Sequence, residues 1–424
     1  MKKLAICLPT YRHPEMIDEM LVRCLDFYDR YDVDLYVYDS SPDNSTEDIV
    51  ASFCKNDQHI IYKQIDEDVQ SNVKALNGLR EIYEKGIYEY LWICPDYFQL
   101  KEEGLRQILD EMKNAPEAII LNYRDVTGIG YKVYFDINDL FLEMAWHMSS
   151  YPATIIRSDL LDEIGWEGMS DKYFKEDRVS LSHIGLYFEA LAKKNKVKAI
   201  HIPIGSDEVG ISSYRKDSMW NYATFMVWCE HWPNTVYALP DIYENKESVI
   251  RSLGINTGIF SERNFKKLWR EGFFDDGIYR KYENKWQLFT DVPNRTIKKI
   301  AHLGQNNIAL FEESAKFRES QIINDFCRRY NNIYLYGCGF VASYITGILK
   351  DNGIDIKAYL VTDSSWEKKE CDGIPVIEFN EAFADDQGNG IIMAMNKNTV
   401  RAMMKMPYAL WMERDNCLKD WQLD

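Results

Sequence analysis

The first half of the chain alternates short apolar runs with amphipathic stretches, and this alternation limits the folds that the chain can adopt. Apolar runs of strand length occur at 4–9, 33–39, 59–65, 88–94 and 117–123. Stretches with apolar residues at helical spacing lie between them, among them 16–28, 71–85 and 101–114. Strands that alternate with helices of this length form mostly parallel sheets, which helices cover on both faces. We therefore predict an α/β fold.

The same pattern predicts where a ligand binds. In open parallel sheets, ligands bind outside the carboxyl ends of the strands. Three apolar runs end in polar clusters, namely PTYR at 9–12, Asp39 with SSPDNS at 40–45, and CPDY at 94–97. These clusters should share one crevice. Asp96 stands at the tip of the most apolar run and is followed by two aromatic residues instead of a second carboxylate.

At 424 residues the chain is too long for a single core, and its pattern divides it into three parts. We predict an α/β domain at 1–235, a helical connector at 236–328 and a small Rossmann-like α/β domain at 329–424. The connector is predicted because charged residues recur there at helical spacing and no run typical of a strand occurs.

Composition argues against several classes of protein. The formal net charge of -17 is unfavourable for a nucleic-acid partner, because phosphate binding requires a basic surface. The nine cysteines contain no C-x-x-C and are odd in number, so they predict neither a disulfide framework nor a zinc site. The first apolar run is short and ends in Pro-Thr-Tyr-Arg, unlike a secretory signal, and no run approaches the ~20 apolar residues of a membrane span. We expect a cytoplasmic protein.

A glycine-rich turn opens the carboxyl-terminal domain. Gly337, Gly339 and Ala342 form a GxGxxA directly after a predicted strand, and Asp363 ends the next strand. This spacing is roughly that of a phosphate-binding turn and its ribose-binding acid, and it suggests a weak second nucleotide site. The alternative is a tight turn that binds nothing, since the domain is only about half of a full dinucleotide-binding fold.

The three polar clusters also carry a resemblance. Four segments, ICLPTYRHPEMIDEML, VDLYVYD, the SSPDNSTEDIV that continues it, and QSNVKALNGLREIYEKGIYEYLWICPDYF, together resemble the inverting family-2 glycosyltransferases of the A-type fold, over roughly residues 1–235. In that family a strand ending in Pro-Thr-Tyr precedes a strand ending in Asp, and a later strand carries an Asp-x-Asp metal motif. The resemblance implies transfer of a sugar, with inversion, from a UDP-sugar to a saccharide, lipid-linked or glycoprotein acceptor. It also implies bacterial surface-polysaccharide or glycoprotein assembly, with peripheral contact at the inner face of the membrane.

The resemblance assigns six residues to the nucleotide sugar: Pro9, Thr10, Tyr11, Arg12, Asp39 and Asp96. The carboxylate of Asp39 would accept a hydrogen bond from the uracil or ribose. Asp96 would be the first carboxylate of the metal motif, but Tyr97 and Phe98 depart from that motif. A divalent ion on a diphosphate is held by one or two carboxylates, so the departure leaves metal dependence open.

The charge of the leaving diphosphate must be neutralised in either case. One interpretation is a weak Mg²⁺ or Mn²⁺ site that uses Asp96 and His201. The other is a cationic clamp formed by Arg215 and Lys216, which are otherwise ordinary surface charges.

An inverting transfer also needs a base that takes the proton of the acceptor hydroxyl. Asp177 in the segment KEDR resembles the acidic residue that opens a late helix of the family. His183, predicted six residues later on the same helix, is the alternative. A six-residue step places the two on different sides of a helix, so only one of them should face the crevice. His183 is otherwise a half-buried structural histidine.

Three other functions compete with this interpretation. A nucleotide-sugar-binding regulatory protein derived from an inactive transferase would explain the incomplete metal motif. An NAD-dependent oxidoreductase would use the turn at 337–342 but would leave the first 235 residues without a role. A nucleotidyltransferase should have a glycine-rich first loop, which LPTYRHPEM lacks. The oligomeric state stays open, with a homo-oligomer as one alternative.

Overall fold

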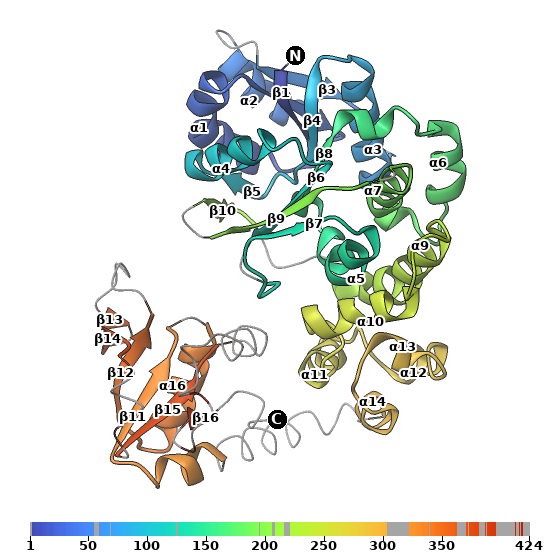
Figure 1. Ribbon diagram of the computed structural model, residues 1–424. Coiled ribbons are helices and arrows are strands. Elements are labelled where there is room, and N and C mark those ends of the chain that lie inside the picture. Colours follow the sequence, from blue (N-terminus) through green and yellow to red (C-terminus); the bar gives the residue numbers. More distant parts are fainter. Residues whose placement is uncertain are drawn as a thin grey trace. The chain divides into compact units, whose positions relative to one another are not determined.

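The chain forms two compact units, Met1–His302 and Leu303–Asp424 (Figure 1). The computed structural model describes residues 2–54, 59–67, 69–123, 126–194, 196–205, 208–215, 221–302, 322–338, 340–362, 370–371, 373–380, 386, 388–395, 412, 415 and 417–418. The domain boundaries expected at 235 and 328 stay predictions.

The first unit is built on an eight-stranded sheet of order β3-β2-β1-β4-β8-β6-β9-β7. Its strands are β1 (Lys2–Thr10), β2 (Val33–Asp39), β3 (Ile60–Gln64), β4 (Tyr88–Ile93), β6 (Ala118–Tyr123), β7 (Lys132–Tyr134), β8 (Thr154–Arg157) and β9 (Ala199–Ile204). β3, β2, β1 and β4 are parallel to one another, whereas β8 is antiparallel to both β4 and β6. The predicted α/β class is confirmed, and each of the five apolar runs coincides with one of these strands to within two residues at either end.

Helices cover both faces of this sheet because their apolar stripes match its apolar faces. They are α1 (Pro14–Arg30), α2 (Ser45–Cys54), α3 (Ser71–Glu84), α4 (Glu102–Met112), α5 (Ile137–Met148) and α7 (Ser182–Ala192), and α6 (Trp166–Tyr173) packs on α7. Figure 1 shows α1 and α4 on one side of the sheet and α3 and α7 on the other. Short 3-10 turns occur at Tyr151–Ala153, Ser158–Leu161, Val179–Leu181 and Asn221–Ala223.

Gly78 allows α3 to approach the sheet closely. A Cβ atom at this position would lie 2.7 Å from the ring of Tyr38 and 3.0 Å from the Sγ atom of Cys7. Real Cβ contacts are not so short, so a larger residue would push the helix outward. The hydroxyl of Tyr38 donates to the carbonyl oxygen of Gly78 over 3.2 Å, which fixes the position of the helix along the strand.

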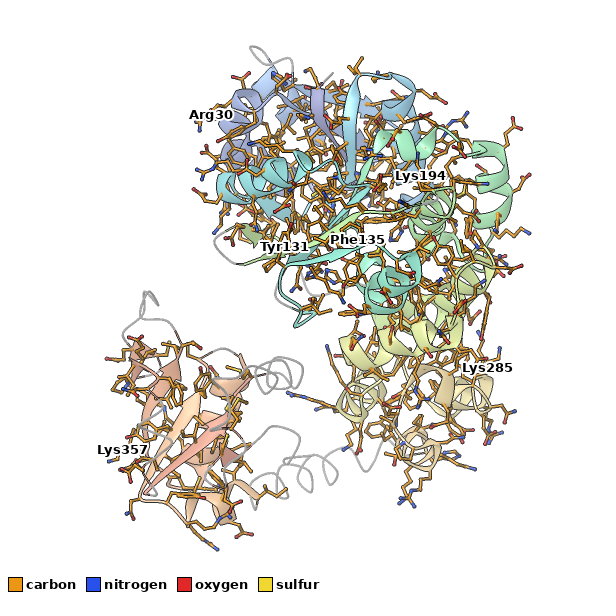
Figure 2. All side chains as sticks on the ribbon, in the orientation of Figure 1. Arg30, Tyr131, Phe135, Lys194, Lys285 and Lys357 are labelled. Atoms are coloured by element: carbon orange, nitrogen blue, oxygen red, sulfur yellow. The ribbon has the colours of Figure 1, made fainter. Side chains whose placement is uncertain are left out.

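Two short elements follow the strand tips and the sheet edge. β5 (Phe98–Leu100) begins two residues after Asp96 and pairs antiparallel with β10 (Val209–Ile211) in a separate ribbon. β7 is one of the two edge strands of the large sheet, and the side chains of Tyr131 and Phe135 that flank it are both exposed (Figure 2).

The remainder of the first unit is helical, as predicted. Its elements are α8 (Thr224–Met226), a π-helix (Val227–His231), α9 (Trp232–Ala238), α10 (Lys246–Thr257), α11 (Glu262–Arg270), α12 (Asp276–Lys281), α13 (Trp286–Phe289) and α14 (Asn294–Ala301). Rings of Phe225, Phe260, Phe265, Phe274 and Trp286 form its core. Within the described parts of the chain, no helix combines the length and the apolar character needed to cross a membrane.

The second unit contains a six-stranded sheet of order β13-β14-β12-β11-β15-β16. Its elements are β11 (Asn332–Tyr336), α16 (Phe340–Asp351), β12 (Ile356–Val361), β13 (Glu370–Cys371), β14 (Ile374–Glu378), β15 (Asn389–Met393) and β16 (Cys417–Leu418). All neighbouring strands are parallel except β13 and β14. This confirms a second α/β sheet.

Candidate functional site

The three polar clusters meet at one edge of the large sheet. The pairing of β1 with β2 sets Thr10 opposite Asp39. The main-chain nitrogen of Cys94 donates to the carbonyl oxygen of Cys7 over 2.9 Å, which keeps the end of β4 beside β1. The side chains that follow these strands therefore lie close together, as the sequence pattern predicts.

Asp96 is almost completely buried and is held by two partners. Its Oδ2 atom accepts a 2.8 Å hydrogen bond from Oγ1 of Thr10, and the Nδ1 atom of His13 lies 2.8 Å from the same oxygen. The bond to the carboxylate raises the pKa of His13, although burial acts against this. Among the described residues, the Oδ1 atom of Asp96 has no hydrogen-bond partner, so it can accept a ligand.

Asp39 is also buried and has partners on both oxygens. Its Oδ1 atom accepts from the main-chain nitrogen of Ser41 (2.9 Å) and from its hydroxyl (2.6 Å), and its Oδ2 atom accepts from the hydroxyl of Tyr62 (3.1 Å). Each carboxylate oxygen can accept about two hydrogen bonds. Asp39 is therefore fixed in place and retains capacity for a further donor.

Lys74, on the first turn of α3, brings a positive charge to this edge. Only 3% of the residue is exposed, and its Nζ atom donates to the carbonyl oxygen of Thr10 and to the hydroxyl of Ser40. Burial lowers its pKa to about 8, against the attraction of Asp39 and Asp96. Lys74 was not predicted from the sequence, because a lysine in an amphipathic helix is usually exposed.

The loop between β1 and α1 is shaped by Arg12. This residue has a φ of 55°, a left-handed conformation that is uncommon outside glycine. Its main-chain nitrogen donates to the hydroxyl of Ser41 over 2.7 Å, while its guanidinium and the hydroxyl of Tyr11 each lie 3.0 Å from the carboxylate of Glu67. Pro9 is buried within β1. Tyr11 and Arg12 thus form the exposed rim of the site.

Arg215 lies close to the strand tip that carries Asp96. Its guanidinium carbon is 3.8 Å from the ring centroid of Tyr97, a cation–π contact. The nitrogen of Ser212 donates to the carbonyl oxygen of Tyr97 (2.8 Å), and its hydroxyl donates to Glu19 on α1 (2.6 Å). These bonds hold the loop after β10 against the site. Lys216, the other member of the predicted clamp, lies outside the described residues.

His201 is not brought to Asp96. It is buried on β9, with Nδ1 2.9 Å from the carbonyl oxygen of Gly130 and Nε2 3.3 Å from the hydroxyl of Thr127. In the strand order, β9 is three strands from β4, which is about 14 Å across a sheet. Two ligands of one Mg²⁺ or Ca²⁺ ion lie within about 5 Å of each other, so these two residues cannot share an ion in this arrangement.

One group of side chains in the described part of the chain has the composition of a divalent metal site. Ligand atoms of Asp32, Asp34 and His59 lie within 4.8 Å of one another. The group stands at the amino end of β2, roughly 16 Å along the strand from Asp39. The Nζ atom of Lys2 already pairs with both carboxylates, at 3.2 and 2.7 Å. This group therefore lies at the opposite edge of the sheet from the candidate site.

Asp177 lies in a turn that precedes Val179–Leu181, whereas α7 begins only at Ser182. The expectation that it shares a helix with His183 was therefore wrong, because the chain makes a 3-10 turn between them. Nε and one Nη atom of Arg178 bind the two oxygens of Asp177 at 2.9 and 3.0 Å. This bidentate contact lowers the pKa of Asp177.

His183 is 2% exposed, and its Nε2 atom is 3.0 Å from the carbonyl oxygen of Ser149. A carbonyl only accepts, so Nε2 carries the proton. Nδ1 has no partner among the described residues. Burial lowers the pKa of His183 to about 4. The ring centroid of Tyr151 lies 4.6 Å from that of His183. The hydroxyl of Tyr151 donates a hydrogen bond to the side-chain oxygen of Asn72, at the start of α3.

The glycine-rich turn of the second unit is described only in part. Gly337 has a φ of 101°, and a Cβ atom there would lie 3.0 Å from the carbonyl oxygen of Ala394, so the turn requires glycine. Ala342 is fully buried in the core of this unit. Gly339 and Asp363 lie outside the described residues. Both described members act in packing, and the second nucleotide site stays a prediction.

Comparison with known proteins gives likenesses of structure alone. No family model and no curated sequence matches the chain.

S. aureus TarS residues 1–349 in complex with UDP-GlcNAc is similar at 14% identity and a TM-score of 0.42, over 69% of this chain and 82% of that one. The mannosyltransferase PcManGT from Pyrobaculum calidifontis, in complex with GDP-Man and Mn²⁺, is similar at 11% identity and a TM-score of 0.41, over 74% and 80%. Glucosyl-3-phosphoglycerate synthase from Mycobacterium tuberculosis, in complex with Mn²⁺, UDP and phosphoglyceric acid, is similar at 11% identity and a TM-score of 0.38, over 57% and 80%. Likeness at this level assigns no residue role.

Proposed function

We propose that the first unit is a glycosyltransferase that moves a sugar from a UDP-sugar to a saccharide or glycoconjugate acceptor, with inversion. The observation that carries the proposal is the meeting of Thr10, Asp39 and Asp96 at one sheet edge. These are the positions that the resemblance of the sequence assigns to the nucleotide sugar. The edge is also where parallel α/β sheets bind ligands.

In this proposal the nucleoside lies along the ends of β1 and β2. Asp39, held by Ser41 and Tyr62, accepts a hydrogen bond from the uracil or ribose. Tyr11 and Arg12 form the rim over it. A rigid carboxylate favours specificity, because a ligand that lacks the matching donor leaves a buried charge unpaired.

The diphosphate then lies towards Asp96 and Arg215. The Oδ1 atom of Asp96 suits one bond to Mg²⁺ or Mn²⁺, whose other ligands would be phosphate oxygens and water. An ion bound there would neutralise charge on the leaving diphosphate. The guanidinium of Arg215, held over Tyr97, supplies positive charge at the same place without a metal.

The acceptor hydroxyl must lose a proton as the new bond forms, and Asp177 is our candidate for the group that takes it. Arg178 binds both oxygens of Asp177, and the Oδ1 atom keeps capacity for a hydrogen bond from the acceptor hydroxyl. His183 is the alternative, and its burial means that α7 would have to move first. The proposed setting is assembly of a bacterial surface glycoconjugate, with acceptors met at the inner face of the membrane.

The paired state of Asp177 favours one second candidate, a regulatory protein that binds a UDP-sugar without turning it over. A metal motif with one carboxylate, and a base whose pKa is lowered by an adjacent arginine, are what we would expect after loss of catalysis. The two candidates share the binding site and differ in whether UDP is released from the bound sugar.

Calorimetric titration with UDP, with and without Mn²⁺, tests the proposal. We expect binding by the native chain and weaker binding by Asp96→Asn. The matched control is Asp110→Asn, since Asp110 is an exposed aspartate paired with Lys113 on α4. UDP release from a panel of UDP-sugars and saccharide acceptors then separates a transferase from a binding protein. Absence of UDP binding in every condition would overturn both candidates.

A further inference from the structure

Lys74 is a buried cation beside the proposed donor site. Burial of an ammonium group is unfavourable unless partners replace the lost water. The structure supplies such partners in the carbonyl oxygen of Thr10 and the hydroxyl of Ser40, the latter at 2.6 Å. The carboxylates of Asp39 and Asp96 lie near enough to stabilise the charge. The ammonium therefore stands among the groups that we assign to the donor.

One N–H bond of the Lys74 ammonium group has no acceptor among the described residues. An ammonium group carries three N–H bonds, and the described residues accept two of them. Neither carboxylate accepts a hydrogen bond from it. The third N–H bond is thus available to an acceptor that the described residues do not supply.

The two hydrogen bonds of Lys74 do not by themselves require a charge. A neutral amide could join the carbonyl oxygen of Thr10 to the hydroxyl of Ser40 without desolvating an ion. Removing one partner from a group of buried charges is strongly destabilising, so the charge of Lys74 also offsets the buried carboxylates of Asp39 and Asp96. Buried groups whose ionisation is perturbed in this way occur preferentially where ligands bind.

We propose that Lys74 binds the diphosphate of the donor through its third N–H bond. The proposal rests on the proposed function, because it takes the ligand to be a nucleoside diphosphate. In this arrangement Asp39 binds the nucleoside while Lys74 and Arg215 bind phosphate oxygens. Lys74 also holds the ends of β1 and β2 together, so binding and positioning are linked in one side chain.

The test compares two ligands and three variants. Lys74→Gln keeps a donor for the carbonyl oxygen of Thr10 but has no charge, and Lys74→Met lacks both. Lys63→Met is the matched control, because Lys63 is an exposed lysine on β3 that pairs with Glu81. UDP binding is measured by calorimetry, and uridine binding is measured by ligand-observed NMR.

We expect Lys74→Gln to weaken UDP binding at least about tenfold while uridine binding and the control stay unchanged. Unchanged uridine binding also shows that the variant is folded, even where Lys74→Met is not. Equal loss for uridine and UDP would overturn the proposal in favour of a purely structural role. Full retention of UDP binding in Lys74→Gln would also overturn it. If the native chain binds neither ligand, the proposed function fails as well.

Discussion

The hydroxyl of Thr10 donates a 2.8 Å hydrogen bond to the carboxylate of Asp96, a residue 86 positions later in the chain. The bond joins the tip of β1 to the tip of β4, and both residues are buried. It sets the direction in which the Oδ1 atom of Asp96 points. The polar end of the sheet is therefore organised before any ligand arrives, which lowers the entropy lost on binding.

Replacement of Thr10 by Val tests this organisation. Valine has nearly the shape of threonine but cannot donate, so Asp96 would keep His13 as its one partner among the described residues. A hydrogen bond to a charged group contributes about 1.5 kcal/mol to folding stability, so we expect UDP binding to weaken by at most roughly tenfold. Calorimetry measures the change, and Thr127→Val, made beside His201, serves as the control. Native affinity in Thr10→Val would mean that the bond plays no part in binding.

The contact between Arg215 and Tyr97 gives a second prediction. Tyr97→Leu removes the ring under the guanidinium, and cation–π contacts contribute about 0.5–2 kcal/mol. We expect Tyr97→Leu and Arg215→Ala to weaken UDP binding, each by several-fold. Because the two side chains act together, the double variant should bind nearly as well as Arg215→Ala. Strictly additive losses would show that Arg215 does not depend on the ring.

The strands predicted from the sequence are those that form a continuous apolar run, because such a run indicates burial. β2 is buried at all seven positions, and its apolar run marks its whole length. β8 was not predicted, because its four residues fall in an irregular stretch. It becomes a strand only by pairing antiparallel with β4 and β6. β5, β7 and β10 have three residues each and carry too little pattern to be recognised.

The residues of the candidate site also fall into two groups, those that the sequence predicts and those that it does not. Thr10, Asp39 and Asp96 were predictable because each follows or ends a strand, and parallel strands end at a common edge. Lys74 was not, since its burial depends on the close approach of α3 to the sheet, which the sequence does not display. His13 follows the PTYR segment directly, and this position was the only available signal of its contact with Asp96.

The approach of α3 can be tested at Gly78. Gly78→Ala would place a methyl group 2.7 Å from the ring of Tyr38, and overpacking of this kind typically destabilises by about 1–3 kcal/mol. Denaturant unfolding measures the change. The matched control is Gly168→Ala on α6, where a Cβ atom would meet nothing within 4 Å. Alanine there should be neutral or slightly stabilising, because it favours helix. Equal stability of the two variants would show that the contact at Gly78 relaxes without cost.

The buried neutral state of His183 predicts how stability changes with pH. Its pKa is lowered to about 4 by burial, whereas an unfolded histidine has a pKa of about 6.5. Between these values the unfolded chain binds a proton that the folded chain does not. Stability therefore falls as the pH is lowered from about 6.5 to about 4, by up to about 3 kcal/mol from this residue.

His183→Gln removes the titration and keeps a side chain that can donate to the carbonyl oxygen of Ser149. We expect the native chain to lose about 2 kcal/mol more than this variant between pH 7.5 and pH 5, measured as the free energy of unfolding in denaturant.

His147 is a useful comparison, because it is equally buried, bonds the carbonyl oxygen of Leu121 at 2.7 Å, and has its pKa lowered to about 4. His147→Gln should therefore show the same difference. An identical pH dependence in the native chain and in His183→Gln would mean that the imidazole of His183 accepts a proton without global unfolding, which requires α7 to open. Such opening would make His183 accessible to an acceptor hydroxyl and would strengthen its candidacy as the base over Asp177.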